Sequence, residues 1–577
     1  MKLSARVFSL VIVLALLLAT AISAGAQESN TVNVQILAVN DFHGNLQPPT
    51  SSSGCVPAVS GCPLPNTVAG GAEYLATHIS NLRATNPNTV VVSAGDLIGA
   101  SPLLSALFHD EPTIEAFNQI GLDFNAVGNH EFDEGVTELL RMQQGGCHPV
   151  DGCLDGDGFG GATFKFLAAN VTWKNNMPKA LAGKPIFPAY MTKSFGGVQI
   201  AFIGMTLEGT PNIVSPAGIS QVNFRDEAAT VNALVPKLKQ AGIEAIVVLI
   251  HEGGDQTTSD ATTDPNGCVG ISGPIVDIVN NFDDEVDVVI SGHTHQPYNC
   301  SIDGKLVTSS FSFGRVVTDV DLTIDPTTRD VVTKIANNTI VTRTVAKHPA
   351  ITALIAKYNA IAAPIANRVI GSITATITRT NNAAGESALG DVIADGQLEA
   401  TNDPGFGEAV VAFMNPGGIR ADLAFPSSAA GEGDGNVTYG EMFTVQPFGN
   451  SMVTMTLTGA QIETLLEQQF TGCVPGTTSN RILQVSNGFT YSWSLSGAPC
   501  NKVDPNTIML NGNVIVPTDS YRVTVNSFLA EGGDSFPILT QGTDRLGGEV
   551  DTDAFEKYFA AHSPVAPGPQ NRITQVP

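Results

Sequence analysis

One pattern recurs through the first 345 residues and limits the fold more than any other feature of the sequence. Apolar runs rich in Val and Ile end in turns that carry Asp, Asn or His, at residues 34–39, 89–92, 124–127, 200–203, 245–250 and 286–290. Continuous apolar runs of this length are typical of strands that are buried on both faces of a sheet. Helical stretches at 72–83 and 227–240 lie between such runs, so the pattern predicts α/β architecture.

The polar residues in these turns are of the types that bind metal ions. Directly after the strand runs stand Asp41, His43, Asp96, Asn129, His130, His251, His293 and His295. The turns hold five of the ten histidines, and ligands gather at the strand ends of α/β sheets. Oxygen and imidazole donors without thiolate suit Zn²⁺, Mn²⁺, Fe or Co²⁺, and about seven donors are enough for two ions that share one carboxylate. Such a pair of ions favours hydrolysis of phosphate esters.

The chain is long enough for more than one domain. At about 100 to 200 residues per domain, 577 residues predict at least two folded units. An Ala- and Ile-rich stretch at 349–367 has helical periodicity and leads into a second region that begins near Val369. That region combines a helix at 389–401, strands at 410–413, 452–457 and 521–526, and Gly-rich loops such as 429–435.

The N-terminus predicts export. Lys2 and Arg6 precede an apolar run at 7–18 and small residues that end at Ala26, which is the pattern of a cleaved secretory signal. A membrane anchor is the alternative, but the run is shorter than the roughly 20 residues that span a bilayer. We expect no later segment to be long and apolar enough to cross a membrane. The sequence therefore predicts a soluble mature protein without stable membrane insertion, located outside the cell or in a periplasm.

The eight cysteines form an even set that an exported protein can oxidise. By proximity along the chain we expect the bonds Cys55–Cys62, Cys147–Cys153, Cys268–Cys300 and Cys473–Cys500. Eight cysteines allow about 105 connectivities, so this pairing rests on proximity alone.

The chain is strongly acidic, with 28 basic and 54 acidic residues and a net charge of −26. Such a surface repels polyanions, so nucleic-acid polymers and anionic membranes are poor partners. A small phosphorylated ligand can still be held by a local metal or arginine cluster. Acidity that serves only solubility also explains the charge, and the sequence leaves the oligomeric state open.

Five short blocks, taken in order, resemble the metallophosphoesterase family: Asp41-Phe42-His43, Gly95-Asp96, Gly128-Asn129-His130-Glu131, His251 and Gly292-His293-Thr294-His295. The longer form of the third block, which extends to Asp133, resembles the 5′-nucleotidase and UDP-sugar hydrolase family. This resemblance implies an N-terminal four-layer αββα sandwich at 30–345, a linker helix at 346–368 and a C-terminal α/β nucleotide-binding domain at 369–577. Residues 1–26 would be the signal peptide.

The resemblance also implies a role for each residue of these blocks. One ion would be held by Asp41, His43, Asp96 and His295, and the other by Asp96, Asn129, His251 and His293, with Asp96 as the bridge. His130 would not bind metal but would donate to a phosphoryl oxygen in the transition state, with its ring oriented by Asp133. A hydroxide bound to the metals would be the nucleophile.

A loop and an arginine patch in the second region resemble the family's phosphate contacts. The segment 415–420 resembles the loop that contacts phosphate and base, and its matching residues are Asn415, Gly418 and Arg420. Pro416 stands where the family usually has Gly and removes one backbone donor. Arg379 matches the farther of two arginines that the family often has upstream, but Ala383 occupies the place of the nearer one. We therefore expect a weaker hold on phosphate.

Two phenylalanines and one carboxylate resemble the family's nucleoside pocket. Phe448 and Phe528 match the aromatics that sandwich the nucleobase, and Asp534 is placed to accept ribose hydroxyls. Ordinary core packing is the alternative for both phenylalanines.

The resemblance implies a hydrolase that releases phosphate from a small nucleotide, of the 5′-nucleotidase type. The alternatives are a 2′,3′-cyclic phosphodiesterase, a nucleotide-sugar or NAD hydrolase, or an esterase for sulfur esters on the same scaffold. A nucleotide-binding surface protein with a vestigial metal site is the alternative outside the enzymes. In this family the C-terminal domain swings to carry substrate to the metals, which makes the helix at 349–367 a candidate hinge.

Overall fold

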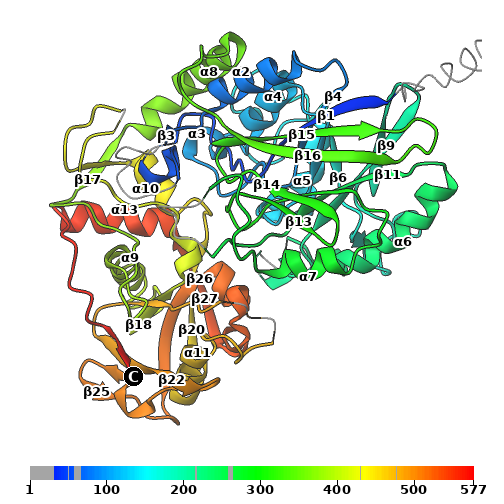
Figure 1. Cartoon of the computed structure of the whole chain (residues 1–577). Coiled ribbons are helices and arrows are strands. Elements are labelled where there is room, and N and C mark those ends of the chain that lie inside the picture. The colour runs from blue at the N-terminus through cyan, green and yellow to red at the C-terminus, as the bar shows by residue number, and fades with distance from the viewer. Residues whose placement is uncertain are drawn as a thin grey trace, which may run out of the picture.

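The structure is a computed structural model that describes residues 31–49, 51–57, 67–212, 214, 218–257, 264–428, 430–475, 477 and 479–577. The predicted signal peptide and Cys62 lie outside these residues. Figure 1 shows two parts of the chain, one coloured blue to green and one coloured yellow to red.

The first part contains two six-stranded sheets (Figure 1). One sheet has the order β16-β15-β1-β4-β5-β6, from β1 (Val32–Val39), β4 (Thr89–Ser93), β5 (Phe124–Ala126), β6 (Lys165–Leu167), β15 (Val316–Ile324) and β16 (Val331–Ile340). The other has the order β13-β14-β12-β11-β9-β8, from β8 (Tyr190–Phe195), β9 (Val198–Thr206), β11 (Ala245–His251), β12 (Val288–Ser291), β13 (Tyr298–Ile302) and β14 (Lys305–Ser309). Neighbours among β1, β4, β5 and β6 run parallel, as do neighbours among β9, β11, β12 and β14. The six predicted strand runs all form strands.

Strand β1 shows how the layers are built. Its side chains alternate, so Ile36 and Ala38 lie in the apolar core between the two sheets, whereas Leu37 and Val39 face a core on the other side. That outer core is closed by α2 (Ala72–Arg83), α4 (Glu111–Ile120) and α5 (Gly135–Gln144), and the second sheet is covered by α6 (Glu227–Gln240) and α7 (Pro274–Asn280). The result is the four-layer αββα sandwich that the resemblance implies.

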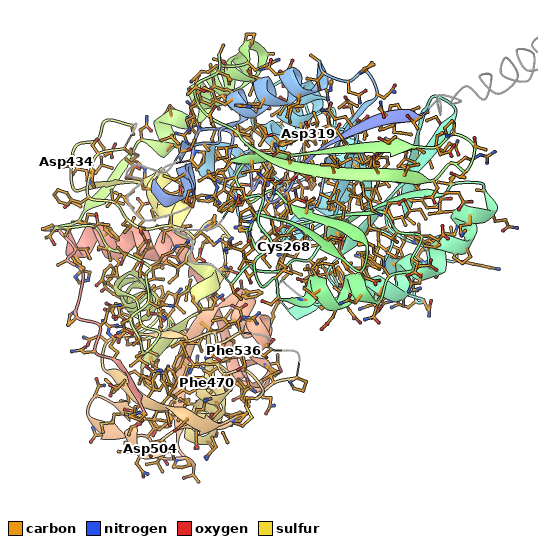
Figure 2. The ribbon with its side chains drawn as sticks, viewed as in Figure 1. Cys268, Asp319, Asp434, Phe470, Asp504 and Phe536 are labelled. Atoms are coloured by element: carbon orange, nitrogen blue, oxygen red, sulfur yellow. A yellow bond between two sulfur atoms is a disulfide. The ribbon has the colours of Figure 1, made fainter. Side chains whose placement is uncertain are left out.

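The second part is built on a five-stranded sheet with the order β21-β18-β26-β20-β27. Its strands are β18 (Val411–Met414), β20 (Ser451–Thr458), β21 (Gln484–Val485), β26 (Ser520–Asn526) and β27 (Thr543–Val550). The helices are α9 (Ala388–Glu399), α10 (Tyr439–Val445), α11 (Gly459–Glu467), α12 (Ser527–Ala530) and α13 (Asp551–His562). A second five-stranded sheet joins β22 (Phe489–Ala498) to β23 (Asn501–Val503), β24 (Met509–Leu510) and β28 (Ile573–Val576), and β25 (Asn513–Val514) pairs with β24. Phe470 and Phe536 lie in the core of this part (Figure 2).

Helix α8 (Pro349–Ala366) connects the two parts. Among the described residues it is the helix that is long and apolar enough to cross a membrane by length and composition, which corrects the expectation that no later segment would be. Its residues Ile351, Leu354 and Tyr358 are buried in the core that α2 and α4 also build. One face of the helix therefore packs on the first part, while Ile361 and Ile365 are exposed.

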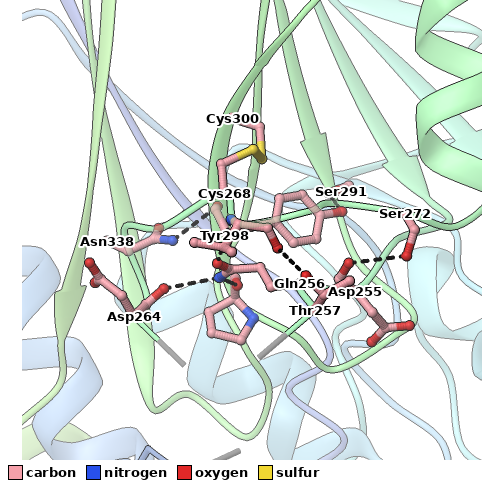
Figure 3. Close-up of a disulfide and its surroundings, with 12 residues drawn as sticks. Asp255, Gln256, Thr257, Asp264, Cys268, Ser272, Ser291, Tyr298, Cys300 and Asn338 are labelled. Atoms are coloured by element: carbon pink, nitrogen blue, oxygen red, sulfur yellow. Dashed lines mark hydrogen bonds between the residues drawn. A yellow bond between two sulfur atoms is a disulfide. The ribbon is translucent and has the colours of Figure 1, made fainter. Parts of the chain in front are cut away.

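Three of the expected disulfides are present: Cys147–Cys153, Cys268–Cys300 and Cys473–Cys500. The fourth expected bond involves Cys62, which lies outside the described residues. Figure 3 shows Cys268–Cys300, which joins the loop after β11 to strand β13. Tyr298 on that strand is buried and forms a 2.6 Å hydrogen bond with the hydroxyl of Ser291. The Cys268–Cys300 disulfide therefore links the segment that follows His251 to the segment that follows His295.

Candidate active site

The carboxyl ends of five strands bring the predicted metal ligands together. The ligands come from the turns after β1, β4 and β5 in one sheet and from the ends of β11 and β12 in the other. We call this set the strand-end cluster; it consists of Asp41, His43, Asp96, Asn129, His251, His293 and His295. All are buried except His293 and His295, which are partly exposed.

Asp96 lies at the centre of the cluster. Its Oδ2 atom is 2.9 Å from His251 Nε2 and 3.7 Å from His43 Nε2. On one side, His295 Nε2 lies 3.0 Å from His43 Nε2 and 3.4 Å from Asp41 Oδ1. Asp96 Oδ2 thus lies between two groups of possible metal ligands, one with His43 and one with His251.

The other side of Asp96 holds the remaining ligands. His251 Nε2 lies 3.1 Å from the side-chain oxygen of Asn129, and the rings of His251 and His293 meet with centroids 5.2 Å apart. Asp96 thus has possible metal-binding side chains on both sides, and by proximity alone His130 is one of them.

The hydrogen bonds of His43 and His251 leave the Nε2 atom of each neutral ring available to bind a cation. His251 Nδ1 donates to the carbonyl oxygen of Ala94 at 2.9 Å, and His43 Nδ1 donates to that of Gly99 at 2.8 Å, since a carbonyl can only accept. In the neutral rings both Nε2 atoms are then acceptors, and both face the carboxylate of Asp96. Acceptor atoms that converge without a donor between them are suited to bind a divalent metal ion.

The pKa values of two neighbouring histidines in the cluster are shifted in opposite directions. Burial lowers the pKa of His251, but the charge and the hydrogen bond of Asp96, together with the charges of Asp41 and Glu131, raise this pKa to about 10. Burial and the charge of His251 lower the pKa of His293 to about 4. The cluster therefore attracts positive charge to the place beside Asp96.

The backbone around the ligands is strained. Five ligands have positive φ angles, which are uncommon for residues other than Gly: Asp41 at 49°, His43 at 47°, Asp96 at 49°, His293 at 71° and His295 at 55°. The loops also approach one another too closely for side chains at two glycines. A Cβ atom on Gly128 would lie 2.2 Å from Asp96 Oδ1, and one on Gly95 would lie 2.6 Å from His251 Nδ1. These glycines are required by close packing of the ligand loops.

His130 and Asp133 lie together beside the cluster. His130 Nδ1 is 2.8 Å from Asp133 Oδ2, and the same oxygen accepts a hydrogen bond from the Ala100 amide at 3.1 Å. The His130 amide also donates to Asp96 Oδ1 at 2.9 Å. Burial lowers the pKa of His130, but the charges of Asp133 and Asp96 outweigh burial and raise it. Asp133 thus fixes the orientation of the His130 ring through Nδ1, which leaves Nε2 to contact a substrate.

Phe448 and Arg420 of the second part lie against the first part. The rings of Phe448 and His130 are stacked, with centroids 5.9 Å apart and planes 17° apart. The guanidinium of Arg420 lies 5.8 Å from the centre of the Phe448 ring. Burial and the charge of Arg379 lower the pKa of Arg420, whereas the charges of Asp133 and Asp96 raise it, so Arg420 is within electrostatic reach of the cluster.

Local hydrogen bonds hold the segments that carry Phe448 and Arg420. Helix α10 begins with a capping box between Thr438 and Glu441 and ends at Val445, three residues before Phe448. The Arg420 amide donates to the carbonyl of Val445 at 2.8 Å, which ties the loop 415–420 to that helix end.

Three of the other predicted substrate residues are linked to one another by hydrogen bonds, and a fourth, Arg379, lines a cavity. Asn415 Nδ2 donates to Asp534 Oδ2 at 2.7 Å, and the Gly418 amide donates to the carbonyl of Asn415 at 3.2 Å. Arg379 is exposed and donates to the carbonyl of Ile419 at 3.0 Å. A cavity of about 260 Å³ lies there, lined by Arg379, Thr380, Asn381, Ser387, Pro416 and Ile419. Pro416 opens a short 3₁₀ turn, where its missing N–H is tolerated.

The two predicted stacking residues are not in direct contact. Phe528 lies against Gly533, where an added Cβ would be 2.5 Å from its ring. Within the described residues, the ring contacts of Phe448 include His130 but not Phe528.

Two residues that the sequence did not single out contact the site. Glu131 accepts hydrogen bonds from the amides of Asp96, Leu97 and Gly128 at 3.0, 2.9 and 2.6 Å. Its place in the third motif block was the available signal. Arg481 Nε lies 3.8 Å from Asp534 Oδ1, and no local pattern indicates this because the two residues come from separate loops.

The chain matches known proteins over most of its length. Residues 34–297 match the calcineurin-like phosphoesterase family, and residues 369–541 match the 5′-nucleotidase C-terminal domain. Cell wall protein Lmo0130 of Listeria monocytogenes is 31% identical over 92% of this chain and 67% of that protein. The chain belongs to the 5′-nucleotidase family. The matched family models imply hydrolysis of phosphoric esters with divalent metal ions.

Two further comparisons place this 5′-nucleotidase family member among its relatives. Endonuclease YhcR of Bacillus subtilis is 32% identical over 96% of this chain, but the chain spans only 42% of YhcR. The crystal structure of a 5′-nucleotidase precursor from Thermus thermophilus superposes with a TM-score of 0.73 at 24% identity, over 94% of this chain and 99% of that one. The latter likeness supports the two-part fold.

Glu131 gives a first testable prediction for this family member. Glu131→Ala removes the acceptor of three buried amides, and each unsatisfied amide costs about 1 to 3 kcal/mol. We expect a lower unfolding temperature and weaker metal binding, because these amides belong to the loops that carry Asp96 and Asn129. Glu131→Gln keeps an acceptor oxygen and should lose less. Equal unfolding temperatures for the parent and Glu131→Ala would contradict this role.

Proposed function

We propose that this chain is an exported two-metal phosphohydrolase that releases phosphate from nucleotides. The observation that carries the proposal is the contact between its two parts. Phe448 is the predicted base-stacking residue and His130 the predicted catalytic residue, and the centroids of their stacked rings are 5.9 Å apart. An aromatic ring and the cation Arg420 therefore stand beside a cluster whose donors suit metal ions.

Two ions would divide the strand-end cluster between them. Asp41, His43 and His295 would hold one ion, Asn129, His251 and His293 the other, and Asp96 would bridge them. When bound, the ions neutralise phosphoryl oxygens and acidify water. Zn²⁺, Mn²⁺, Co²⁺ and Fe all suit this donor set.

The chain's own residues would orient and stabilise the phosphoryl group. His130, held by Asp133, presents Nε2 as a hydrogen-bond donor to a phosphoryl oxygen when the ring is protonated. The raised pKa of His130 favours that protonated form. Arg420 adds a second positive charge from the other part of the chain.

The second part would supply the preference for nucleotides. Phe448 and Phe528 would stack on the base, and Asp534, held by Asn415, would accept ribose hydroxyls. Burial raises the pKa of Asp534, although the charge of Arg481 opposes this shift. In this proposal residues 30–345 form the catalytic domain, 346–368 the linker helix and 369–577 the substrate domain.

Export rests on two features. The pattern at 1–26 is that of a signal peptide, and the bonds Cys147–Cys153, Cys268–Cys300 and Cys473–Cys500 are of a kind that forms in oxidising compartments.

The name of YhcR raises the alternative of nucleic-acid cleavage. The chain spans 42% of YhcR, so the endonuclease activity of that protein can reside outside the shared part. The net charge of −26 also opposes binding of polyanions. A small nucleotide needs only the local charges of Arg379, Arg420 and the metals.

A substrate panel tests the proposal. The metal-loaded mature protein is given AMP, ATP, a nucleotide sugar, NAD, a 2′,3′-cyclic nucleotide and an aryl phosphate, and released phosphate and nucleoside are both measured. We expect release of phosphate and nucleoside from AMP to be fastest. Preference for the aryl phosphate over every nucleotide would refute a nucleotidase.

The aromatic pair gives a second prediction. Replacing both Phe448 and Phe528 by Ala removes stacking worth about 1 to 3 kcal/mol per ring, so kcat/KM for AMP should fall by about 10² or more. The aryl phosphate should be affected little, because it reaches the metals without the pocket. The matched control is Phe406→Ala, since this ring is 66% exposed and belongs to none of the predicted site motifs. An unchanged ratio of the two kcat/KM values in the double variant would exclude the base sandwich.

A further inference from the structure

A second group of metal-ligand side chains lies outside the strand-end cluster. It consists of His109, His148 and Asp151, which we call the disulfide-loop cluster. His109 Nε2 is 2.9 Å from Asp151 Oδ2, and His148 Nδ1 is 3.2 Å from the same oxygen. The two imidazoles are stacked, with centroids 3.8 Å apart and planes 18° apart. Their side chains are only 16% and 14% exposed.

The cluster joins two segments that the fold holds in place without a metal. His109 follows the short helix α3 (Leu103–Ala106) and has a positive φ of 51°. His148 and Asp151 lie in a tight hairpin that the Cys147–Cys153 disulfide closes, and paired hydrogen bonds between His148 and Gly152 support it. The three side chains are thus brought together before any ion binds, and the imidazole of His148 has to turn out of its stack on His109 for one ion to lie in the planes of both rings.

We propose that the disulfide-loop cluster is a binding site for Zn²⁺ or a cation of similar chemistry. Tetrahedral zinc with bonds of about 2.0 to 2.1 Å places its ligand atoms roughly 3.3 Å apart, close to the distances from Asp151 Oδ2 to the two imidazoles. Two imidazoles and one carboxylate are a common zinc set that leaves a fourth position for water.

The surroundings of His109 support a metal ligand. His109 Nδ1 lies 2.9 Å from Glu134 Oε2, so the ring can donate from Nδ1 to this carboxylate while Nε2 faces Asp151. Histidines that bind metals commonly make this second contact, because it fixes the tautomer and the ring orientation. His148 Nδ1 now accepts a hydrogen bond from the Asp151 amide at 3.1 Å, and a bound ion would take over that lone pair.

An ion-pair network without metal is the competing explanation. A protonated His109 could donate to Glu134 and Asp151 at the same time, and such a network does not need the imidazole of His148. The two explanations therefore differ at His148, which is a ligand in one and dispensable in the other.

The site would steady two loops of the active site. Glu134 directly follows Asp133, the partner of His130. Asp110 directly follows His109, and its Oδ2 accepts from the Gly99 amide at 2.9 Å. The carbonyl of Gly99 in turn accepts from His43 Nδ1. A cavity of about 30 Å³ has His109 and Glu134 on its wall together with His130 and Asp133. Zinc here would hold the disulfide hairpin to both loops.

The test measures zinc binding to the full mature chain with Asp96→Asn in every variant, which weakens the strand-end cluster. Zinc bound per chain is measured by equilibrium dialysis and elemental analysis. The unfolding temperature is measured with and without zinc. We expect His148→Ala to bind one zinc ion fewer than its Asp96→Asn parent and to lose the zinc-dependent rise in unfolding temperature. Glu134→Gln should weaken binding by about 10- to 100-fold. The matched control His562→Ala removes an exposed histidine that pairs with Glu399, and should bind zinc like the parent.

Asp151→Asn provides a second variant of nearly unchanged shape if His148→Ala proves unstable. The proposal is overturned if His148→Ala and Asp151→Asn bind as much zinc as the parent, since the cluster is then an ion-pair network only.

Discussion

Asp96→Asn should abolish hydrolysis and leave the protein with two metal ions fewer per chain. Asp96 Oδ2 lies 3.7 Å from His43 Nε2 and 2.9 Å from His251 Nε2, so its charge would allow two cations to lie side by side. We expect kcat/KM to fall by more than about 10³-fold, beyond the effect of losing one transition-state donor. The asparagine keeps an oxygen for the His130 amide, which protects the fold.

Metal content by elemental analysis and phosphate release from AMP check this prediction together. The matched control is Asp319→Asn, because Asp319 lies on β15 and accepts from Gln35, away from the ligands. Full activity with both ions retained in Asp96→Asn would show that the bridge is assigned to the wrong residue.

His130→Ala should separate turnover from metal binding. Asp133 holds the ring of His130, which stacks on Phe448 and meets the ring of His43 edge-on, and we assign this ring to the substrate and not to a metal ion. We expect both ions to remain and kcat to fall by about 10² to 10³, the cost of losing one preorganised donor to a developing charge. Asp133→Asn should show part of this loss, because Asp133 orients the ring and raises the pKa of His130.

The pH profile distinguishes this role from a structural one. Burial lowers and Asp133 raises the pKa of His130, and the net rise keeps the ring protonated to a higher pH. Asp133→Asn removes that charge, so the alkaline limb of kcat should move to lower pH. Loss of one metal ion in His130→Ala would instead identify His130 as a ligand.

The strands that carry the ligands could be predicted because they are buried on both faces. Their continuous Val and Ile runs differ from the alternation of half-exposed strands, and the polar residue after each run marks the strand end. Helices α2 and α6 begin and end where their apolar periodicity does. The candidate ligands, with His130 among them, followed from residue type and from position after a strand, whereas the assignment of seven of them to two ions was implied by the resemblance.

Features that depend on long-range pairing could not be predicted. Strand β1 pairs with β15, nearly three hundred residues later, and no local signal specifies that neighbour. The positive φ angles of Asp41 and His295 oppose their local preference and are imposed by the surrounding loops. The contact of Phe448 with His130 depends on how the two parts of the chain pack.

Glu131 and the disulfide-loop cluster were missed for a similar reason. Glu131 stood inside a recognised block, but its contacts with Asp96 and Leu97 come from a different loop. His109 and His148 are far apart in sequence and meet only through the hairpin that Cys147–Cys153 closes.

Anomalous X-ray scattering from crystals loaded with Mn²⁺ tests the two-metal claim most directly. The account predicts two peaks about 3.5 to 4 Å apart at the ends of β1, β4, β5, β11 and β12, with Asp96 between them. One should lie beside Asp41 and His295, and the other beside Asn129 and His251. A single peak there in active, fully loaded crystals would contradict it.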